Sequence, residues 1–380
     1  MRWLGAICFS IVMLAQHALA APVLERGVNL SHWLQYEGRQ PVVAADMAAI
    51  KAAGFDHVRI AFDPFFLGWR VEDGADPTLL PRVELLDKAI DMALAAGLDA
   101  IVDFHPRASR FEEMENSARG KSAFVALWGA LARRYADRPV DRVAFEILNE
   151  PQYYRPGPRA WNDLAAKALA AIRQAAPNHL VLIACTEGSR VEALEKLAAV
   201  NDPQVAYVFH FYDPYLVTHL NAPWEPWKSN VNGMVSGIVY PAAQMTISGV
   251  FFKRGANLRE ASGAVSKYMD QGWGPERMTQ MAESAAAWAK RHQARLVVTE
   301  FGVLRQGIDT GSRLRWLQDV RTALETAGIG WTVWDYADVF GVAQSEGAVS
   351  RQADGAIVPR DMDRVRRRFE PAALEALGLP

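Results

Sequence analysis

Cysteine is scarce in this chain, and its placement excludes a framework of disulfide bonds. Only two of the 380 residues are cysteine, Cys8 and Cys185. Cys8 lies in an N-terminal segment that has Arg2 near its start, an apolar run over residues 3–14 and a small-residue cleavage site, which is the pattern of a secretory signal peptide. We therefore predict a signal peptide over residues 1–20 and a secreted or periplasmic protein. The mature chain keeps one cysteine, so a packed core must stabilise it.

An excess of charge of either sign is also missing. The chain has 41 Lys and Arg residues against 43 Asp and Glu residues, a formal net charge of −2. No basic field is therefore available to attract a nucleic-acid backbone. After residue 20 no apolar run reaches the roughly 20 residues that a membrane span needs, and the N-terminal run is too short. We expect a monomer that neither binds nucleic acid nor spans a membrane.

A glycine-rich phosphate-binding motif is absent after the first predicted strand, which disfavours a doubly wound dinucleotide-binding sheet. Instead, one unit recurs at residues 49–62, 91–104 and 323–336. In each copy an alanine-rich helix end, a glycine and a short β-branched or aromatic strand follow one another. Glycine suits the left-handed residue that ends a helix, and repeated helix–strand units indicate a parallel sheet. The three glycines are Gly54, Gly97 and Gly328.

The same alternation continues along the mature chain. Strands are predicted at 27–30, 56–61, 99–104, 142–148, 180–184, 205–211, 295–299 and 329–334. Helices are predicted near 42–53, 82–96, 121–136, 159–176, 190–199, 275–292, 312–327 and 361–377. Eight strands alternating with eight helices predict a (β/α)8 TIM barrel, which we assign as one domain over residues 21–380. A long insertion, 212–274, follows the sixth strand; its many aromatic residues indicate an ordered extension of the active face.

In such a barrel the functional groups gather where the strands end at their carboxyl side. The stretch "FEILNEP" places Asn149 and Glu150 after the fourth strand, and "VVTEFG" places Glu300 after the seventh. Two carboxylates that face one mouth are the pair required for glycoside hydrolysis, in which one protonates the leaving oxygen and the other attacks. The other strand ends carry Arg59, His105, His210, Tyr212, Trp334 and Asp335.

The neighbours of the two glutamates suggest different roles for them. Arg59 and the hydroxyl of Tyr212 would hold Glu300 ionised, which suits a nucleophile. Glu150, beside a neutral amide and a partly desolvated wall, would keep its proton, which suits a general acid. The amide of Asn149 would bind a sugar 2-hydroxyl. The flat face of Trp334 would stack on a sugar ring.

Six stretches carry a resemblance to a known family: "RGVNLSHWL", "HVRIAF", "FEILNEP", "HFYDP", "VVTEFGV" and "WTVWDY". They resemble the strand-end motifs of glycoside hydrolase family 5, the cellulase-type family, over nearly the whole mature chain. The resemblance implies a retaining mechanism with Glu150 as acid/base and Glu300 as nucleophile, a polysaccharide or oligosaccharide substrate, and no cofactor or metal. The segment "FHPRASR" and the Trp-rich insertion depart from the family pattern, so the substrate stays open. The residues that match the family's site are Arg59, His105, Asn149, Glu150, His210, Tyr212, Glu300 and Trp334.

Other polar and aromatic residues receive mostly structural interpretations. Glu146 is predicted to pair with a basic residue. Asp103 and His105 share one strand face, but the pattern is too poor in histidine to favour a metallohydrolase. Three residues stay open between substrate groove and protein core: His219, Trp224 and Trp227. Five are predicted to be structural, buried or exposed without function: His32, His57, His179, His292 and Cys185.

The leading hypothesis is a secreted retaining β-glycoside hydrolase that acts on a β-linked glucan. A β-mannanase or an exo-β-1,3-glucanase is the alternative, and internal versus terminal cleavage stays open. A barrel that binds polysaccharide without cleaving it would lack one of the two glutamates, yet both are present. A metal-dependent hydrolase on the same fold would lose its activity in a chelator.

Overall fold

The computed structural model describes residues 21–71, 80–107, 115, 117–152, 157–222, 224, 234–253, 257–346, 349–351, 357–359 and 366–380. The predicted signal peptide and Trp227 lie outside these residues.

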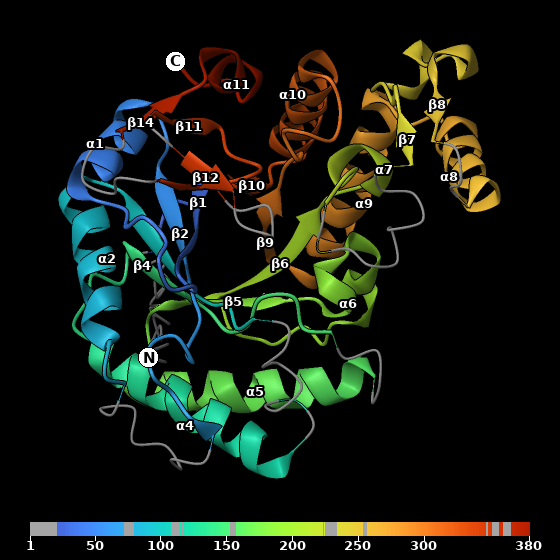
Figure 1. The fold of residues 1–380 in the computed structure, drawn as a ribbon. Coiled ribbons are helices and arrows are strands. Elements are labelled where there is room, and N and C mark those ends of the chain that lie inside the picture. Colours follow the sequence, from blue (N-terminus) through green and yellow to red (C-terminus); the bar gives the residue numbers. More distant parts are fainter. Residues whose placement is uncertain are drawn as a thin grey trace, which may run out of the picture.

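Within the described residues, eight parallel strands close into a barrel (Figure 1). Each strand pairs with its predecessor and its successor along the chain, and the last strand pairs with the first. The predicted TIM barrel and its eight strands are therefore confirmed. The strands are β1 (Arg26–Leu34), β2 (His57–Phe62), β3 (Asp99–Phe104), β4 (Val143–Glu146), β5 (Leu180–Ala184), β6 (Val205–Phe211), β9 (Arg295–Phe301) and β10 (Gly330–Val333).

The interior of the barrel changes from apolar to charged along its axis. Asp103, Glu146 and His210 each follow an apolar interior residue by two positions on their strands, and all three are buried. Alternate residues of a strand face the same side, so these polar groups form the next layer toward the carboxyl ends. Buried charges persist only where they are paired, which locates the site at this end. The apolar layers contain Leu24, Ile101, Ala144, Leu180, Leu182, Ala184, Ala206, Val208 and Val297.

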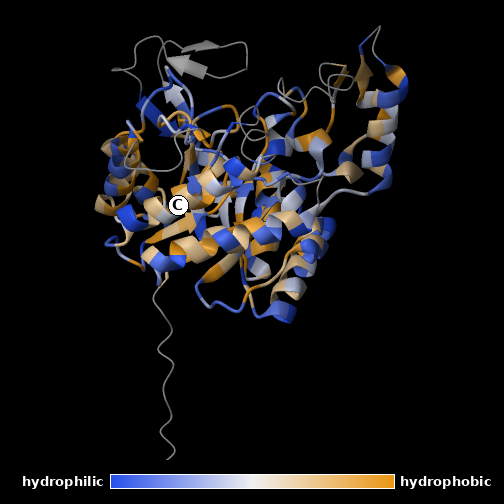
Figure 2. Ribbon diagram, turned by 90° about the horizontal axis from the view of Figure 1, so that it is seen from below, coloured by the Kyte–Doolittle hydropathy of each residue, from blue (hydrophilic) through white to orange (hydrophobic). Residues whose placement is uncertain are grey.

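Helices surround the barrel, and hydrophobic and hydrophilic residues interleave along them (Figure 2), as expected where one helix face packs on a core. The predicted helix-ending residues Gly54, Gly97 and Gly328 have φ of 91°, 78° and 69°, which confirms their left-handed conformation. None of the helices in the described part of the chain combines the length and apolarity needed to cross a membrane. The main helices are α1 (Ala44–Ala52), α2 (Val83–Ala95), α4 (Ala118–Tyr135), α5 (Pro158–Ala175), α9 (Pro275–His292) and α10 (Thr310–Thr326).

The prediction of one long final helix over 361–377 was wrong. Within the described part of that range, Arg366–Phe369 form strand β14, which pairs antiparallel with β11 (Ala343–Glu346). Helix α11 covers only Pro371–Ala376. Residues 361–365 lie outside the described part of the chain.

Two anchored side chains explain why this segment is extended. Arg367 Nη1 donates to Oδ2 of the buried Asp46 at 2.6 Å, and the ring of Phe369 stacks on Phe55 with centroids 5.8 Å apart. Anchors at every second residue have the period of a strand rather than that of a helix.

The structure also differs from the prediction of a helix near 190–199. A single turn, α6 (Thr186–Ser189), precedes a 3₁₀ helix, η3 (Val191–Lys196). Glu187 and Ser189 have φ of 59° and 58°. A non-glycine residue in this conformation cannot continue a right-handed helix, so α6 ends after one turn. The 3₁₀ helix η3 ends in turn at Leu197, whose backbone is extended.

The insertion between β6 and β9 projects from the barrel (Figure 1). Tyr240, Tyr268 and Trp273 are buried and belong to the same hydrophobic core as the barrel and its helices. Trp224 is 43% exposed. Its described elements are α7 (Tyr215–Thr218), β7 (Val235–Ser236), η5 (Ala242–Gln244), η6 (Ile247–Gly249), β8 (Phe251–Phe252) and α8 (Leu258–Asp270).

Candidate active site

An irregularity at the end of β9 brings two consecutive side chains to the barrel mouth. Phe209 of β6 pairs with Val298, whereas the next residue, His210, pairs with Glu300. Thr299 is therefore the extra residue of a bulge. Bulges redirect side chains next to functional sites, and here both Thr299 and Glu300 contact interior polar groups.

Glu150 reaches the same mouth from the end of β4 by way of an unusual backbone conformation. Its φ is 44°, a left-handed value that non-glycine residues seldom adopt. The preceding Asn149 is fixed by its backbone N–H, which donates to the carbonyl of Phe104 at 2.9 Å. Glu150 Oε1 then lies 3.0 Å from His210 Nδ1. The Glu150 side chain is 32% exposed, whereas that of Glu300 is 6% exposed.

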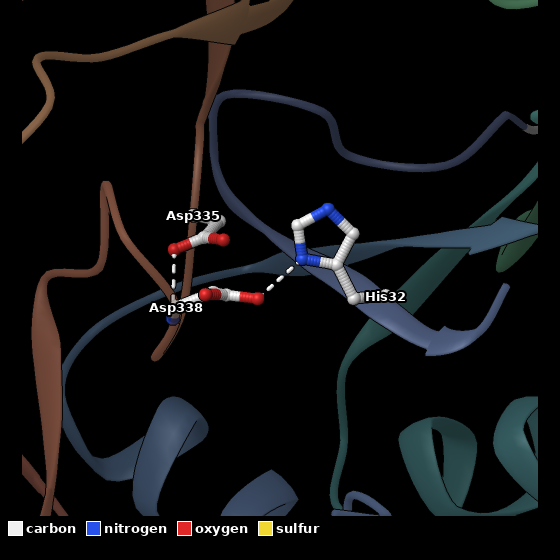
Figure 3. A group of neighbouring side chains, drawn as sticks. All are labelled: His32, Asp335 and Asp338. Carbon is white, nitrogen blue, oxygen red and sulfur yellow. Dashed lines mark hydrogen bonds and ion pairs between the residues drawn. The ribbon is translucent and has the colours of Figure 1, made fainter. Parts of the chain in front are cut away.

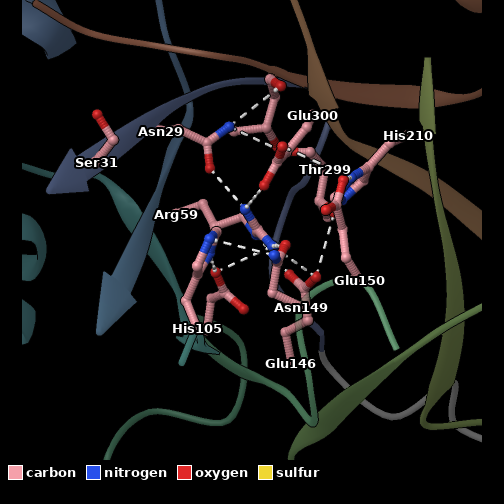
Figure 4. Close-up of polar contacts among 12 residues, drawn as sticks. Asn29, Ser31, Arg59, His105, Glu146, Asn149, Glu150, His210, Thr299 and Glu300 are labelled. Carbon is pink, nitrogen blue, oxygen red and sulfur yellow. Dashed lines mark hydrogen bonds and ion pairs between the residues drawn. The ribbon is translucent and has the colours of Figure 1, made fainter. Parts of the chain in front are cut away.

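The two glutamates are close neighbours. An oxygen of Glu150, an oxygen of Glu300 and a ring nitrogen of His210 all lie within 4.8 Å of one another (Figure 4). Carboxyl groups about 5–5.5 Å apart belong to retaining glycosidases, whereas inverting enzymes need about 6.5–9.5 Å for a water molecule between them. The separation here fits the shorter class.

Arg59, on β2, is the central connection of the site and uses all of its donors. Its Nε and Nη2 donate to the two oxygens of Glu146 at 2.7 and 2.9 Å. Its Nη1 donates to Asn29 Oδ1 at 2.9 Å and to Glu300 Oε1 at 2.8 Å. Its Nη2 also donates to Asn149 Oδ1 at 2.9 Å. A guanidinium has five N–H groups in a rigid fork. These contacts therefore fix the residues at the end of β4 and Glu300 near the end of β9.

Three buried carboxylates share this single guanidinium. Burial lowers the pKa of Arg59, but attraction to Asp103, Glu146 and Glu300 outweighs it and raises the pKa well above its usual value. Burial raises the pKa of Asp103 to about 7 and also raises the pKa of Glu146. One positive charge does not neutralise three negative ones in a desolvated site. Asp103 therefore keeps its proton at pH values where an exposed aspartate has lost it.

Glu300 receives a second donor from the opposite side. The hydroxyl of Tyr212, which follows β6, donates to Glu300 Oε2 at 2.9 Å. Together with Arg59, this donor fixes the position of the Glu300 carboxyl group. The predicted contacts of Glu300 with Arg59 and Tyr212 are thus present, and so is the predicted pairing of Glu146 with a basic residue.

His105 and Asn149 form the other wall. Asn149 Nδ2 lies 3.1 Å from His105 Nε2, and His105 Nδ1 lies 2.8 Å from Asp103 Oδ2. Burial lowers the pKa of His105 to about 4, so the neutral ring donates from Nδ1 to Asp103 and accepts from Asn149. Asp103 Oδ2 also lies 3.0 Å from Arg59.

Trp334, after β10, is half-buried and stacks on His105 with ring centroids 5.6 Å apart. The ring of His32 meets it edge-on, with centroids 6.2 Å apart. His32 contacts Asp338, and Asp338 N–H donates to Asp335 Oδ1 at 3.1 Å (Figure 3). Burial lowers the pKa of His32, but the Asp338 charge outweighs it and raises the pKa. His32, predicted to be structural or exposed, therefore supports the Trp334 side of the site.

A cluster of rings lies behind Tyr212. His219, left open in the sequence, is buried and stacks on Tyr215 with centroids 4.4 Å apart. Its ring also meets Tyr212 at 4.9 Å and Phe340 at 5.3 Å. His219 therefore belongs to the packing that holds Tyr212, and Trp224 lies at the edge of this cluster, 6.2 Å from Phe340.

A cavity of about 620 Å³ opens beside Glu150, between the barrel and the insertion. Lys267, Tyr268 and Gln271 of α8 and its C-terminal end form one wall, and Arg190 lies on the barrel side. The polar and charged side chains that line it are suited to sugar hydroxyls.

The structure thus brings together all eight residues that the sequence matched to a site. Sequence reasoning missed Asn29, whose amide orients Arg59 and donates to the carbonyl of Thr299 at 2.9 Å. It also missed Thr299 itself, because a bulge leaves no mark in the residue pattern. The alternation Gly27, Asn29, Ser31 along β1 was the available signal for Asn29.

Comparisons with known proteins agree with this geometry. A family model described as Cellulase (glycosyl hydrolase family 5) matches residues 18–339. The chain belongs to glycosyl hydrolase family 5. Endoglucanase C of Acetivibrio thermocellus is 27% identical over 329 residues, which cover 82% of this chain and 90% of that one.

Solved structures of family 5 share the fold. Endoglucanase Cel5A of Thermotoga maritima is 26% identical with a TM-score of 0.68, covering 93% of this chain and 97% of that one. A structure of Cel5A with mannotriose is 24% identical, with the same TM-score and coverage. The family-5 chain is therefore a glycoside hydrolase, and the site described above lies at the barrel face where such chemistry occurs.

Proposed function

We propose that this glycoside hydrolase cleaves β-linked glucan by a retaining, double-displacement reaction with Glu300 as the nucleophile. The observation that carries the proposal is the separation of the two glutamates, with oxygens within 4.8 Å. Donors from Arg59 and Tyr212 hold the Glu300 carboxylate in place, so that it can attack the anomeric carbon while the glycosidic bond breaks.

Glu150 is the acid and then the base of the same reaction. It is more exposed than Glu300 and faces the cavity between barrel and insertion, where a departing sugar would lie. In the first step its proton passes to the leaving oxygen. In the second step it takes a proton from water, whose oxygen attacks the anomeric carbon while the bond from that carbon to Glu300 breaks. Asn149 has a second amide N–H for the sugar 2-hydroxyl, and Trp334 offers a stacking face.

A β-1,4-glucan cut internally is the substrate we favour. Endoglucanases are prominent among the relatives, and the cavity beside Glu150 leaves room for sugar units beyond the cleaved bond. A β-mannan is the second candidate, because the similar Cel5A was crystallised with mannotriose. We also propose export by the N-terminal signal segment, which would give the enzyme access to polysaccharide outside the cytoplasm.

The test is release of reducing ends from β-1,4-glucan, β-1,3-glucan and β-mannan by the mature enzyme, with and without chelator. We expect Glu300→Gln and Glu150→Gln to lose roughly three orders of magnitude in kcat on unactivated substrate. The exposed Glu195→Gln serves as the matched control and keeps full activity. NMR of the first product should show the β-anomer. An α-anomer would overturn retention, and loss of activity in chelator would overturn the metal-free mechanism.

A further inference from the structure

We propose that Thr299 and Glu146 are positioning residues that keep the acid proton on Glu150, by fixing the tautomer of His210. The inference rests on the proposed function, because it concerns the acid of that reaction. A continuous chain of contacts runs from Glu150 through His210 and Thr299 to Glu146, at 3.0, 3.2 and 3.2 Å (Figure 4). Its three inner members are buried.

Glu146 determines which group donates and which accepts in each of these hydrogen bonds. Both oxygens of Glu146 accept from Arg59, at 2.7 and 2.9 Å. Burial favours the neutral acid and raises the pKa of Glu146, so it is this two-point contact that holds the ionised form. An ionised carboxylate only accepts hydrogen bonds. The Thr299 hydroxyl must therefore donate to Glu146 and accept from His210 Nε2.

The other nitrogen of His210 is then an acceptor. Burial lowers the pKa of His210 to about 4, so the ring is neutral near pH 7 and carries one proton, which the contact with Thr299 places on Nε2. The lone pair of Nδ1 faces Glu150 Oε1 at 3.0 Å. A hydrogen bond at this distance requires Glu150 to be the donor, which means that Glu150 is protonated.

The reverse arrangement contains the same number of protons. A neutral Glu146 would donate to Thr299, Thr299 to Nε2, and Nδ1–H to an ionised Glu150, which would remove the acid. The guanidinium of Arg59 selects between the two arrangements, since it stabilises charge on Glu146. After Glu150 has given its proton to the leaving oxygen, its carboxylate faces the Nδ1 lone pair. That repulsion makes it a stronger base toward water in the second step.

Other ionisable groups surround Glu150 and His210. Glu300 Oε2 is 3.5 Å from His210 Nδ1, but Tyr212 and Arg59 already supply its donors. Among the described residues, Asp103, His105 and Cys185 interact electrostatically with Glu150. The cavity that Glu150 faces is also lined by the ionisable residues Glu187, Arg190, Glu192, Asp213 and Lys267.

The decisive variant is Thr299→Val, which keeps the shape of the side chain and removes the hydroxyl, with Thr299→Ser as the matched control. His210 can then turn its N–H toward Glu150 and stabilise the carboxylate. On an unactivated oligosaccharide we expect kcat/KM to fall about 10- to 100-fold and its basic limb to move down by about one pH unit. On a nitrophenyl glycoside, whose leaving group needs no proton, the loss should stay below about threefold. Thr299→Ser keeps the hydroxyl, so its kcat/KM on the oligosaccharide and its pH profile should both stay close to those of the wild type.

A loss that is equal for both substrates, with an unmoved pH profile, would show that Thr299 only packs and would overturn the proposal. A second readout does not depend on activity. In the full-length protein labelled with ¹⁵N-histidine, and with the His210 signal assigned from His210→Asn, we expect the proton on Nε2; a proton on Nδ1 would also overturn the proposal. An inactive wild type with the expected His210 tautomer would count against the proposed function instead.

Discussion

At the residue scale, the site depends on donors that hold carboxylates in chosen protonation states. Arg59 serves Glu146 and Glu300 at the same time, and Tyr212 serves Glu300 alone. A guanidinium is a planar fork, so a lysine at position 59 would not reproduce these contacts. The surroundings of the two glutamates differ: Glu300 accepts from N–H and O–H groups, whereas Glu150 faces the imidazole of His210. The proposed mechanism assigns their different roles on this difference.

Tyr212→Phe tests this division of roles. The change removes one donor to a buried carboxylate, worth about 1.5–3 kcal/mol, so we expect kcat to fall about 10- to 100-fold. The fold should persist, because the ring keeps its packing against His219 and Phe340. Steady-state kinetics with a thermal melt provide the measurement. Tyr240→Phe, whose hydroxyl binds Asp319, should leave kcat unchanged; an equal loss there would assign the effect to stability.

At the element scale, the end of β9 is what makes the site possible. The bulge at Thr299 turns two adjacent side chains inward, and the following Gly302 lets the chain pass close to β10. A Cβ on Gly302 would lie 2.1 Å from the carbonyl oxygen of Trp334. The atom in the way belongs to the backbone, which cannot rotate aside as the end of a flexible side chain can. A larger residue at position 302 must therefore displace the end of β9 or the end of β10.

Gly302→Ala should therefore reduce both stability and activity, with Trp334 displaced from His105. We expect kcat/KM to fall at least about tenfold, because a misplaced binding face loses orientation. Gly263→Ala is the matched control: it lies in α8 with nothing near its Cβ position, and alanine should raise helix stability by about 0.5–1 kcal/mol. Melting curves and kinetics of both variants would decide, and unchanged activity in Gly302→Ala would contradict the argument.

Elements and strand-end residues were largely predictable from the sequence, for a physical reason. Buried strands are short apolar runs, and a polar residue directly after one, such as Glu150 or Glu300, must lie at the mouth. Contacts that depend on backbone irregularity were not predictable. The bulge at Thr299 has no composition of its own, and the arginine-rich segment of β14 reads as a charged helix until its packing partners Phe55 and Asp46 are known.

At the scale of the whole molecule, the barrel is stable although it buries several ionisable groups that water would solvate better. The apolar layers below the site and the ring of helices outside it supply the burial that offsets this cost. The insertion extends the main hydrophobic core and forms a wall of the cavity beside Glu150. Function in this molecule is therefore concentrated at one end of a structure whose remainder provides stability.

Burial of His210 should make the free energy of unfolding depend on pH. The pKa of His210 is about 4 in the folded protein and about 6.5 in an unfolded chain. Between these values the unfolded chain binds a proton that the folded one does not, so acidification favours unfolding by about 1.4 kcal/mol per pH unit. His210→Asn lacks this term. It should be less stable than the wild type at pH 7, where a hydrogen-bonded ring is lost, and the gap should shrink toward pH 4. Urea unfolding followed by tryptophan fluorescence from pH 7 to 4 measures the gap. Tyr212→Phe keeps His210, so its gap from the wild type should stay nearly constant; parallel curves for His210→Asn as well would show that His210 is not held neutral by the fold.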